Sequence, residues 1–386
     1  MQDKGTAIFE LFSKETIRYS TIEKDGFRVL RINFFNEVIS ALDLLKTYYK
    51  ANNISSGYLD NFLSVSLESP LGYKKPSFRK EDIRHDRKVA AFQCCLYKAQ
   101  FKNHNKKVFF KGIKEVNQSI IKDRILDPSK GISLEEACLW FEWVWEHYND
   151  AGSYFEKKKQ KEGKEWADED LKSLMVMISG FRTPKKKNQI YGFKILNRKD
   201  LHDLHTNKVQ ETFDKEIISF LRKGKIVIVD LSQGKPEVQR TFSERICDRI
   251  FANAMNRFVN TKPNNFIQFY FEESHNLFPK KDDKDLSQIY NRIAKEGAKL
   301  NLGMIYATQE PSSISSNILK NTQNWFIAHL NNEDELREIK KYYDFGDFVD
   351  SLVRFSATND KGFIKMKTYT NPFVIPVQID RFLANK

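Results

Sequence analysis

The C-terminal part of the chain alternates short apolar runs with longer amphipathic stretches, and this alternation limits its possible folds more than any other feature. Short apolar runs are typical of buried parallel strands, and amphipathic stretches between them are typical of helices that cover a sheet. We therefore predict an α/β fold whose mostly parallel sheet is covered on both faces. The expected strands span residues 225–231, 266–271, 302–308, 325–330, 362–369 and 373–379, and the expected helices span residues 238–258, 286–299, 315–320 and 334–343.

The N-terminal part shows a similar but shorter pattern. Residues 27–33 alternate apolar and polar side chains as a strand does, and residues 7–15 and 37–49 have the spacing of helices. A strand followed by a helix indicates an α/β unit, so we assign this part to the same sheet.

The middle of the chain is predicted to be helical and rich in aromatic residues, with helices over 89–101 and 108–125. Ser133 and Glu136 have the spacing of a capping box, which starts another helix. Its aromatic residues are either bundle core, as the helical spacing favours, or a stacking platform for bases. The predicted domains are residues 1–79, an N-terminal part of the sheet, residues 80–223, a helical insertion with a basic linker, and residues 224–386, the C-terminal half of the sheet.

The charge balance points to a polyanionic partner, with nucleic acid as the first candidate. The chain has 64 Lys and Arg residues against 51 Asp and Glu residues, a net charge of +13. Two basic segments, 157–161 and 183–187, are interpreted as solvated loops or as contacts with a DNA backbone. No apolar run approaches the roughly 18 residues of a membrane span, and the four cysteines form no C-x-x-C pair, so a cytoplasmic location is predicted.

Two acidic residues follow the expected strand at 266–271. Glu272 and Glu273 are adjacent, and His275 comes two residues later. The carboxyl edge of an open parallel sheet is where ligands bind, so these side chains are placed where a nucleotide would lie. One carboxylate can hold a Mg²⁺ hydration shell and the next can polarise a water molecule. The alternative is a pair of surface acids at the end of a strand.

Polar residues also end the neighbouring strands. Thr308 and Gln309 follow the strand at 302–308, where a glutamine can lie beside a γ-phosphate or its attacking water. Asp230 and Ser232 end the strand at 225–231 and are expected to face the same edge. The alternatives are a polar strand exit and a helix N-cap, respectively.

The order of these motifs resembles one family. It runs from strand-Asp230-Leu-Ser232 through a long helix to strand-Glu272-Glu273-x-His275-Asn276, then Arg292-Ile-Ala-Lys-Glu-Gly297, strand-Ala-Thr308-Gln309-x-Pro311, Asn-Ile-Leu and a further strand. This order resembles the HerA-like helicases and translocases of the HerA/FtsK superfamily, and the related ATPases of conjugative DNA transfer. The resemblance extends over residues 225–382.

The resemblance implies a RecA-like P-loop NTPase core and a role for each motif residue. Glu272 would hold Mg²⁺ through a water molecule and Glu273 would activate the hydrolytic water, as a Walker B pair. Gln309 would be the sensor for ATP, and Asp230, Ser232, Thr308 and His275 are assigned to nucleotide binding. His275 would link the carboxylates to the fold or to the DNA side, and the alternative is a satisfied polar side chain. The resemblance further implies DNA as the partner and a homo-hexamer, or a complex with other ATPase or nuclease subunits.

Two features depart from the family pattern. The phosphate-binding loop G-x-x-x-x-G-K-[ST] does not occur in the 386 residues, and the nearest sequence, Lys4-Gly5-Thr6, precedes the expected helix at 7–15 where such a loop would lie. The position of the family's arginine finger is occupied by Ala298, which leaves Arg292 or Lys299 as candidates for contact with a neighbouring subunit.

The predicted function is therefore that of an ATP-driven DNA translocase subunit or fragment that hydrolyses ATP weakly or not at all on its own. Two alternatives stay open. The chain is a non-catalytic regulator or scaffold on a degenerate ATPase fold, or it belongs to the motor of a conjugation or secretion apparatus.

Overall fold

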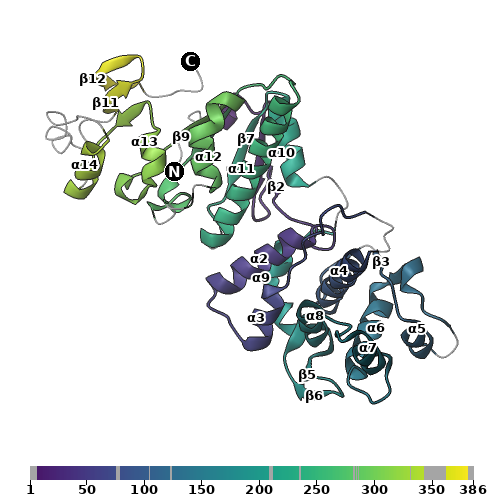
Figure 1. The fold of residues 1–386 in the computed structure, drawn as a ribbon. Coiled ribbons are helices and arrows are strands. Elements are labelled where there is room, and N and C mark those ends of the chain that lie inside the picture. Colours follow the sequence, from purple (N-terminus) through teal and green to yellow (C-terminus); the bar gives the residue numbers. More distant parts are fainter. Residues whose placement is uncertain are drawn as a thin grey trace. The chain divides into compact units, whose positions relative to one another are not determined.

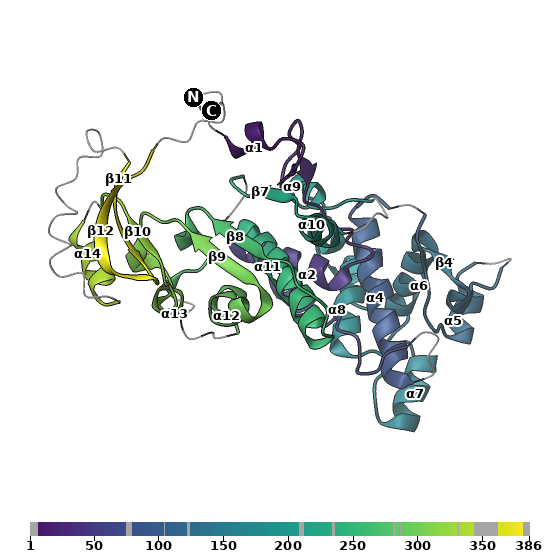
Figure 2. The ribbon, with the colours of Figure 1, turned by 90° about the horizontal axis from the view of Figure 1, so that it is seen from above.

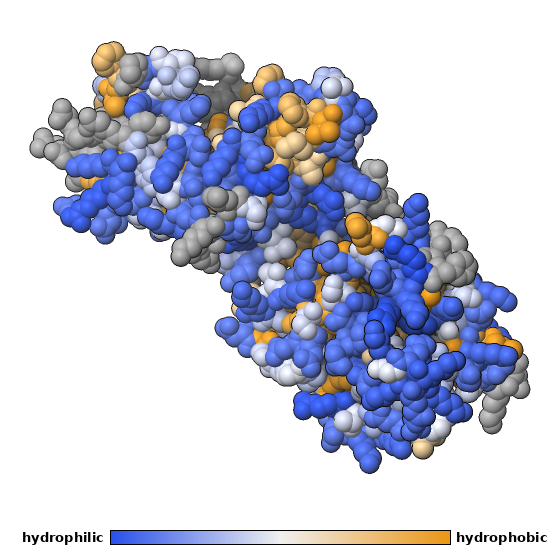
Figure 3. All heavy atoms as spheres, in the orientation of Figure 1, coloured by the Kyte–Doolittle hydropathy of each residue, from blue (hydrophilic) through white to orange (hydrophobic). Residues whose placement is uncertain are grey.

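The computed structural model describes residues 7–74, 79–103, 105–121, 124–207, 212–233, 236–280, 283, 285, 287–330, 332–342 and 362–380. The predicted Lys4-Gly5-Thr6 turn lies outside these residues. The chain divides into two compact units, Met1–Tyr19 with Asp25–Arg28 and Asp214–Lys386, and Ser20–Lys24 with Val29–Phe213. We refer to them as the strand unit and the helical unit. Figure 3 shows that the face in view carries mainly hydrophilic residues on both.

The helical unit is built on three mutually packed helices, α4 (Lys80–Lys98), α6 (Leu134–Glu146) and α8 (Glu169–Ser179), seen in Figure 1 and Figure 2. Helix α3 (Gly57–Ser64) packs on α8, and α2 (Val38–Ala51) packs on α3 and α4. The main part of the unit thus starts at Val29, before the predicted boundary at residue 80, and α2 and α3 bury apolar side chains as they pack on these helices. Its shorter elements are α5 (Lys114–Ser119), α7 (Tyr154–Glu162), α9 (Lys199–Asp203), β3 (Lys107–Val108), β4 (Ile132–Ser133), β5 (Phe181–Thr183) and β6 (Lys187–Gln189).

Local sequence signals explain where α6 begins and what it buries. The Ser133 hydroxyl accepts a hydrogen bond from the Glu136 amide at 3.1 Å, and the Glu136 carboxylate accepts one from the Ser133 amide at 2.9 Å. The predicted capping box is therefore confirmed. Trp140 and Phe141 are completely buried and meet edge-to-face at 5.1 Å. They belong to the core of the unit, as their helical spacing favours.

Two segments differ from the prediction. The expected helix over 108–125 is shorter, because Val108 pairs with Ile132 in a two-stranded ladder and α5 starts only at Lys114. The basic segment 157–161, expected as a loop, lies in α7. The Ser153 hydroxyl accepts from the Glu156 amide at the start of that helix, and Gly163 ends it in the left-handed conformation. These two caps stabilise a helix in spite of the repulsion between its lysines.

His205 is buried among aromatic rings in the helical unit. Its Nδ1 accepts a hydrogen bond from the Phe34 amide at 3.1 Å, and its Nε2 donates to the Lys102 carbonyl at 2.7 Å. Burial lowers the pKa of this imidazole, so the folded unit holds it neutral.

We expect the free energy of unfolding of this unit to fall as the pH drops below about 6.5, the ordinary pKa of histidine. In that window the unfolded imidazole takes up a proton that the buried one binds only at lower pH, so the unfolded state gains stability until the pH passes below the folded pKa. Urea unfolding at a series of pH values measures this loss. Burial lowers the pKa of the neighbouring His202 as well, so His205→Asn should reduce the loss without abolishing it. An unchanged pH dependence in that variant would contradict the assignment.

Within the residues that the structure describes, the strand unit contains three small sheets. Strands β1 (Thr16–Ser20), β2 (Arg28–Val29) and β7 (Ile226–Asp230) form one sheet in the order β2-β1-β7. Strands β8 (Ile267–Phe271) and β9 (Leu302–Tyr306) form a parallel pair. The third sheet has the order β10-β11-β12, and the helices are α1 (Ile8–Leu11), α10 (Phe213–Arg222), α11 (Pro236–Val259), α12 (Ile289–Glu296), α13 (Ser316–Lys320) and α14 (Glu333–Lys340). The prediction of an α/β fold with parallel strands is confirmed.

The predicted single sheet is not what the described strands form. Strand β10 (Trp325–Ile327) was expected to continue a parallel sheet, but it pairs antiparallel with β11 (Phe363–Thr368), which in turn pairs antiparallel with β12 (Asn371–Gln378). The later strands were predicted from their apolar runs, and such runs do not encode the choice of partner. Among the described residues, no helix is both long enough and apolar enough to cross a lipid bilayer.

One face of the β8–β9 pair is buried and the other is exposed. Side chains alternate along β8, so that Phe269 and Phe271 are buried whereas Tyr270 is 59% exposed. The buried Phe271 ring meets the Tyr290 ring of α12 edge-to-face at 5.5 Å, and the Tyr290 hydroxyl donates to Ser243 of α11 at 2.7 Å. Helices α11 and α12 also pack against each other. They hold the strand pair in place, so that the position of its carboxyl edge is fixed.

Candidate functional site

The carboxyl ends of β8 and β9 lie at one edge of the strand unit. The two strands are parallel and in register, with Phe271 opposite Tyr306. Because parallel strands end on the same side, the residues that follow Phe271 and those that follow Tyr306 emerge together. The Ala307 amide continues the ladder by donating to the Phe271 carbonyl at 2.8 Å. The predicted site residues at 272–275 and 308–309 follow directly.

Four of these residues form one group, which we call the Glu273 cluster: Glu273, His275, Thr308 and Gln309. The Gln309 side-chain amide donates to the Glu273 carboxylate at 3.4 Å. His275 Nδ1 lies 3.2 Å from the Thr308 hydroxyl and 3.6 Å from the other Glu273 oxygen. The Glu273 side chain is 53% exposed, so water and a ligand can reach its carboxylate. The cluster thus places the accessible Glu273 carboxylate, which can act as a base, beside the Gln309 amide and the His275 imidazole.

The backbone at Glu273 adopts a left-handed conformation, with φ 45° and ψ 47°. This conformation costs a non-glycine residue roughly 1–2 kcal/mol, and such strain is often found at functional sites. The next residue compensates for it: the Ser274 amide and hydroxyl both donate to the Ala307 carbonyl at 3.0 Å, and Ser274 is completely buried. Sequence reasoning missed Ser274. A small polar residue directly after the paired acids was its only signal.

Glu272 is exposed and lies on the same face of β8 as Tyr270, two residues earlier. Burial raises the pKa of the Tyr270 hydroxyl, and the Glu272 carboxylate raises it further. Within the described residues no group of three or more His, Cys, Asp or Glu side chains could hold a metal ion. Mg²⁺ bound next to a nucleotide needs only one or two carboxylates, since water and phosphate oxygens complete its octahedron. An exposed carboxylate at this edge fits that requirement.

Asp230 is the last residue of β7, and Ser232 follows two residues later. Strand β7 belongs to the hydrogen-bonded sheet β2-β1-β7. The Asp230 carboxylate accepts hydrogen bonds from the Ser232 amide at 3.0 Å and from its hydroxyl at 2.6 Å. The sequence predicted that both residues face the same edge as the paired acids. The structure pairs β7 with β1 and bonds Ser232 to Asp230, and the shared edge with the paired acids stays a prediction.

The Arg292 side chain is 38% exposed. It lies on α12, with its guanidinium 4.4 Å from the ring centre of Phe251 on α11 and its Nε 3.9 Å from the Glu296 carboxylate. Its positive charge also lowers the pKa of Asp248, which burial and Glu244 raise. At the end of α12, a side chain on Gly297 would meet the Leu302 carbonyl at 2.8 Å, so glycine allows the chain to turn directly into β9.

No model of a known protein family matches the chain. Among curated proteins, it is 26% identical over 148 residues to the DNA double-strand break repair helicase HerA of Sulfolobus acidocaldarius. It is 27% identical over 153 residues to HerA of Sulfurisphaera tokodaii. The predicted resemblance to the HerA-like ATPases is confirmed. The matched segments cover 36% and 34% of this chain and 28% and 29% of the two HerA proteins, so the chain spans somewhat over a quarter of their length.

Two solved structures are more distant. The genome packaging NTPase B204 of Sulfolobus turreted icosahedral virus 2, in complex with ATP-gammaS, is 13% identical, with a TM-score of 0.32 over 41% of this chain and 69% of that one. VirB4 of Thermoanaerobacter pseudethanolicus is 10% identical, with a TM-score of 0.37 over 96% of this chain and 79% of that one. These TM-scores are too low to indicate a shared fold. The similarity to HerA therefore rests on the sequence matches.

Proposed function

We propose that the chain supplies the hydrolytic carboxylates of a HerA-like motor ATPase that moves along DNA. The observation that carries the proposal is the Glu273 cluster, in which Glu273 and Gln309 meet at the carboxyl edge of a parallel strand pair. The similarity to HerA supports the same function. The strand unit would be part of a RecA-like core and the helical unit an insertion into it. We further propose a cytoplasmic homo-hexamer, or a complex with other ATPase or nuclease subunits.

The cluster suits the hydrolysis of a phosphoanhydride bond. The Glu273 carboxylate takes a proton from water, the water oxygen attacks the γ-phosphorus, and the bond to the leaving oxygen of ADP breaks. Gln309, which donates a hydrogen bond to Glu273, is placed to orient that water or to report the γ-phosphate. Mg²⁺ held by Glu272 through water would supply charge neutralisation on the phosphate oxygens. In this proposal Thr308 and His275 position the carboxylate of Glu273.

We expect the chain alone to hydrolyse ATP far below about 1 s⁻¹, an ordinary enzymatic rate. The reason is that its 386 residues contain no G-x-x-x-x-G-K-[ST] loop, whose amides and lysine would compensate the triphosphate charge. Turnover of the purified chain is measured by phosphate release, with and without duplex DNA. A rate of about 1 s⁻¹ or more would show that other groups of this chain hold the phosphates.

The absence of that loop from the sequence also favours the second candidate, a regulator or scaffold on a degenerate ATPase fold. The two candidates differ in what Glu273 does. In the motor, Glu273→Gln stops hydrolysis by the assembled complex, and in the scaffold it leaves the complex as active as before. A conjugation or secretion motor would use the same residues, so only its partners would distinguish it.

A further inference from the structure

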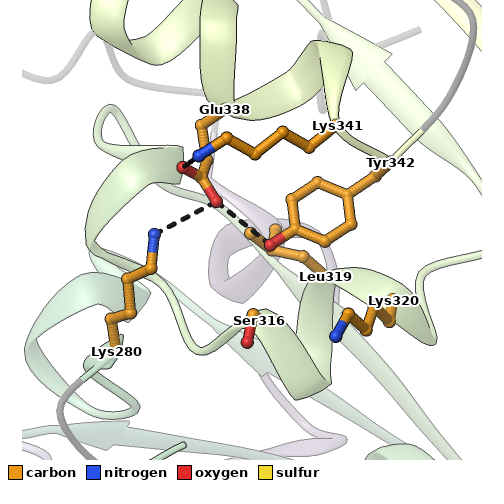
Figure 4. A pocket seen from close by; sticks show the side chains of 7 residues that line it. All are labelled: Lys280, Ser316, Leu319, Lys320, Glu338, Lys341 and Tyr342. Atoms are coloured by element: carbon orange, nitrogen blue, oxygen red, sulfur yellow. Dashed lines mark hydrogen bonds and ion pairs between the residues drawn. The ribbon is translucent and has the colours of Figure 1, made fainter.

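A pocket of about 430 Å³ lies in the strand unit on α13 and α14, and the residues of the Glu273 cluster do not line it. Lys280 comes from the segment after β8, Lys320 from α13, and Lys341 follows α14 (Figure 4). The remaining lining residues are Ser316, Leu319, Glu338 and Tyr342. Its volume is that of a site for an organic ligand of moderate size and is far larger than one phosphate ion needs.

Two carboxylates lie close to the three ammonium groups that line the pocket. Glu338 is part of the lining, and Asp283 lies behind Ser316, whose amide and hydroxyl both donate to it. Glu338 is buried and accepts from Lys341 at 2.7 Å and from the Tyr342 hydroxyl at 3.0 Å, and it lies 3.2 Å from Lys280. Burial alone would raise the pKa of this carboxyl, but the hydrogen bonds from these groups outweigh burial and hold the pKa below its ordinary range. Glu338 is therefore charged. Burial would raise the pKa of Asp283, but hydrogen bonds from Ser315, Ser316 and Asn317 hold it below its ordinary range, so Asp283 is charged too. The two carboxylates offset two of the three ammonium groups, and one positive charge remains in excess.

Lys320 is the source of that excess. It is exposed, and within the part of the chain that the structure describes it makes no side-chain hydrogen bond or ion pair. Figure 4 shows Lys280 and Lys320 on opposite sides of the pocket, with Glu338 bonded on the Lys280 side. An anion that enters would meet Lys320 directly and would compete with Glu338 for the other two ammonium groups. The Ser316 hydroxyl and the apolar surfaces of Leu319 and Tyr342 complete the lining.

The walls of the pocket are connected to the segments that carry the Glu273 cluster. The Ser315 amide, next to α13, donates to the Phe278 carbonyl at 3.0 Å in the segment that leads from Glu273 to Lys280. Three residues after Gln309, the Ser312 amide and hydroxyl both donate to the buried Glu335 of α14 at 2.7 Å. The pocket therefore belongs to the same packed region as the candidate hydrolytic site.

We propose that this pocket binds a phosphodiester group of a nucleic acid backbone. Lysine ammonium groups recognise phosphate oxygens without regard to base sequence, and a translocase needs such contacts. The pocket is wide enough for a backbone phosphate with its sugar, and the sugar would pack against Leu319 and the Tyr342 ring. The choice of nucleic acid over a free phosphate rests on the proposed function.

The test uses the full chain and a fluorescently labelled DNA duplex, with binding followed by anisotropy at a series of salt concentrations. Lys320→Gln should reduce the slope of log affinity against log salt by about 0.9, because one phosphate contact is lost. The same loss corresponds to about fivefold weaker binding near 0.15 M salt. The matched control is Lys262→Gln, an exposed lysine before β8 at the opposite end of that strand, and it should leave both quantities unchanged.

Glu338→Gln gives a second and opposite expectation. Removing the carboxylate charge releases Lys280 and Lys341 for the ligand, so duplex binding should become tighter and its salt dependence steeper. A purely structural role for Glu338 would not strengthen binding. A thermal melt of each variant identifies any that is misfolded, and Lys320→Gln, an exposed change, keeps the test valid if Glu338→Gln does not fold.

The outcomes separate this proposal from the proposed function. If the wild-type chain binds duplex and Lys320→Gln changes neither affinity nor slope, the pocket proposal is overturned while the motor function stands. Inorganic phosphate is tested on the same two proteins. If phosphate binds the wild-type chain saturably but not Lys320→Gln, and both proteins bind duplex equally well, the ligand is free phosphate and the proposal is also overturned. If the wild-type chain binds no duplex even at low salt, the proposed function itself fails.

Discussion

Glu273→Gln is expected to lower ATP hydrolysis by the assembled motor by about 10²–10⁴-fold, the usual contribution of a general base. Glutamine keeps the size and the hydrogen-bonding shape of the side chain but cannot take a proton from water. Because the Glu273 side chain is half exposed and its contacts with Gln309 and His275 are long, at 3.4 and 3.6 Å, the exchange should leave the fold unchanged. Steady-state phosphate release by the wild-type and variant complexes measures the effect.

The matched control is Glu333→Gln. Glu333 is an exposed glutamate at the start of α14, where it contacts Arg337 and has no part in the Glu273 cluster. Its exchange removes the same charge and should leave the rate unchanged. Equal rates for the wild-type, Glu273→Gln and Glu333→Gln complexes would mean that the carboxylate edge is vestigial, and the regulator or scaffold would then be the better assignment.

Trp140→Ala is expected to cost about 3–5 kcal/mol of unfolding free energy, the largest stability effect that we predict for a single change in the helical unit. The Trp140 ring is completely buried, lies 5.0 Å from Phe110, and donates its indole N–H to Asn117 at 2.9 Å. Alanine would leave a cavity in the unit and an unpaired acceptor on Asn117. Urea unfolding followed by far-UV circular dichroism measures the loss.

Trp143 provides the comparison on the same helix. It is only partly buried, stacked on His147 at 4.1 Å, so Trp143→Ala should cost much less. If the two substitutions cost the same, Trp140 is not the core residue that its burial indicates. If Trp140→Ala left stability intact and weakened DNA binding, the aromatic residues would serve as a stacking platform instead.

Sequence patterns located the elements of the candidate site with good accuracy. The apolar runs at 266–271 and 302–308 correspond to β8 and β9, and the polar residues after them meet at one edge because both strands run in the same direction. The Ser133 capping box and the burial of Trp140 could also be predicted from the sequence, because a cap and a helical period are local properties. The identity and order of the motifs along the chain are sufficient for the HerA-like resemblance.

The sequence by itself determined which residues end the strands, since hydrophobic period and turn chemistry act over a few neighbouring positions. Only the tertiary structure decided which strands pair. It paired β7, which ends at Asp230, with β1, sent β10 into an antiparallel sheet, and brought Lys280, Lys320 and Lys341 to one pocket with Glu338. The physical reason is that strand pairing and pocket formation depend on contacts between residues far apart in the chain, and no local pattern records those contacts.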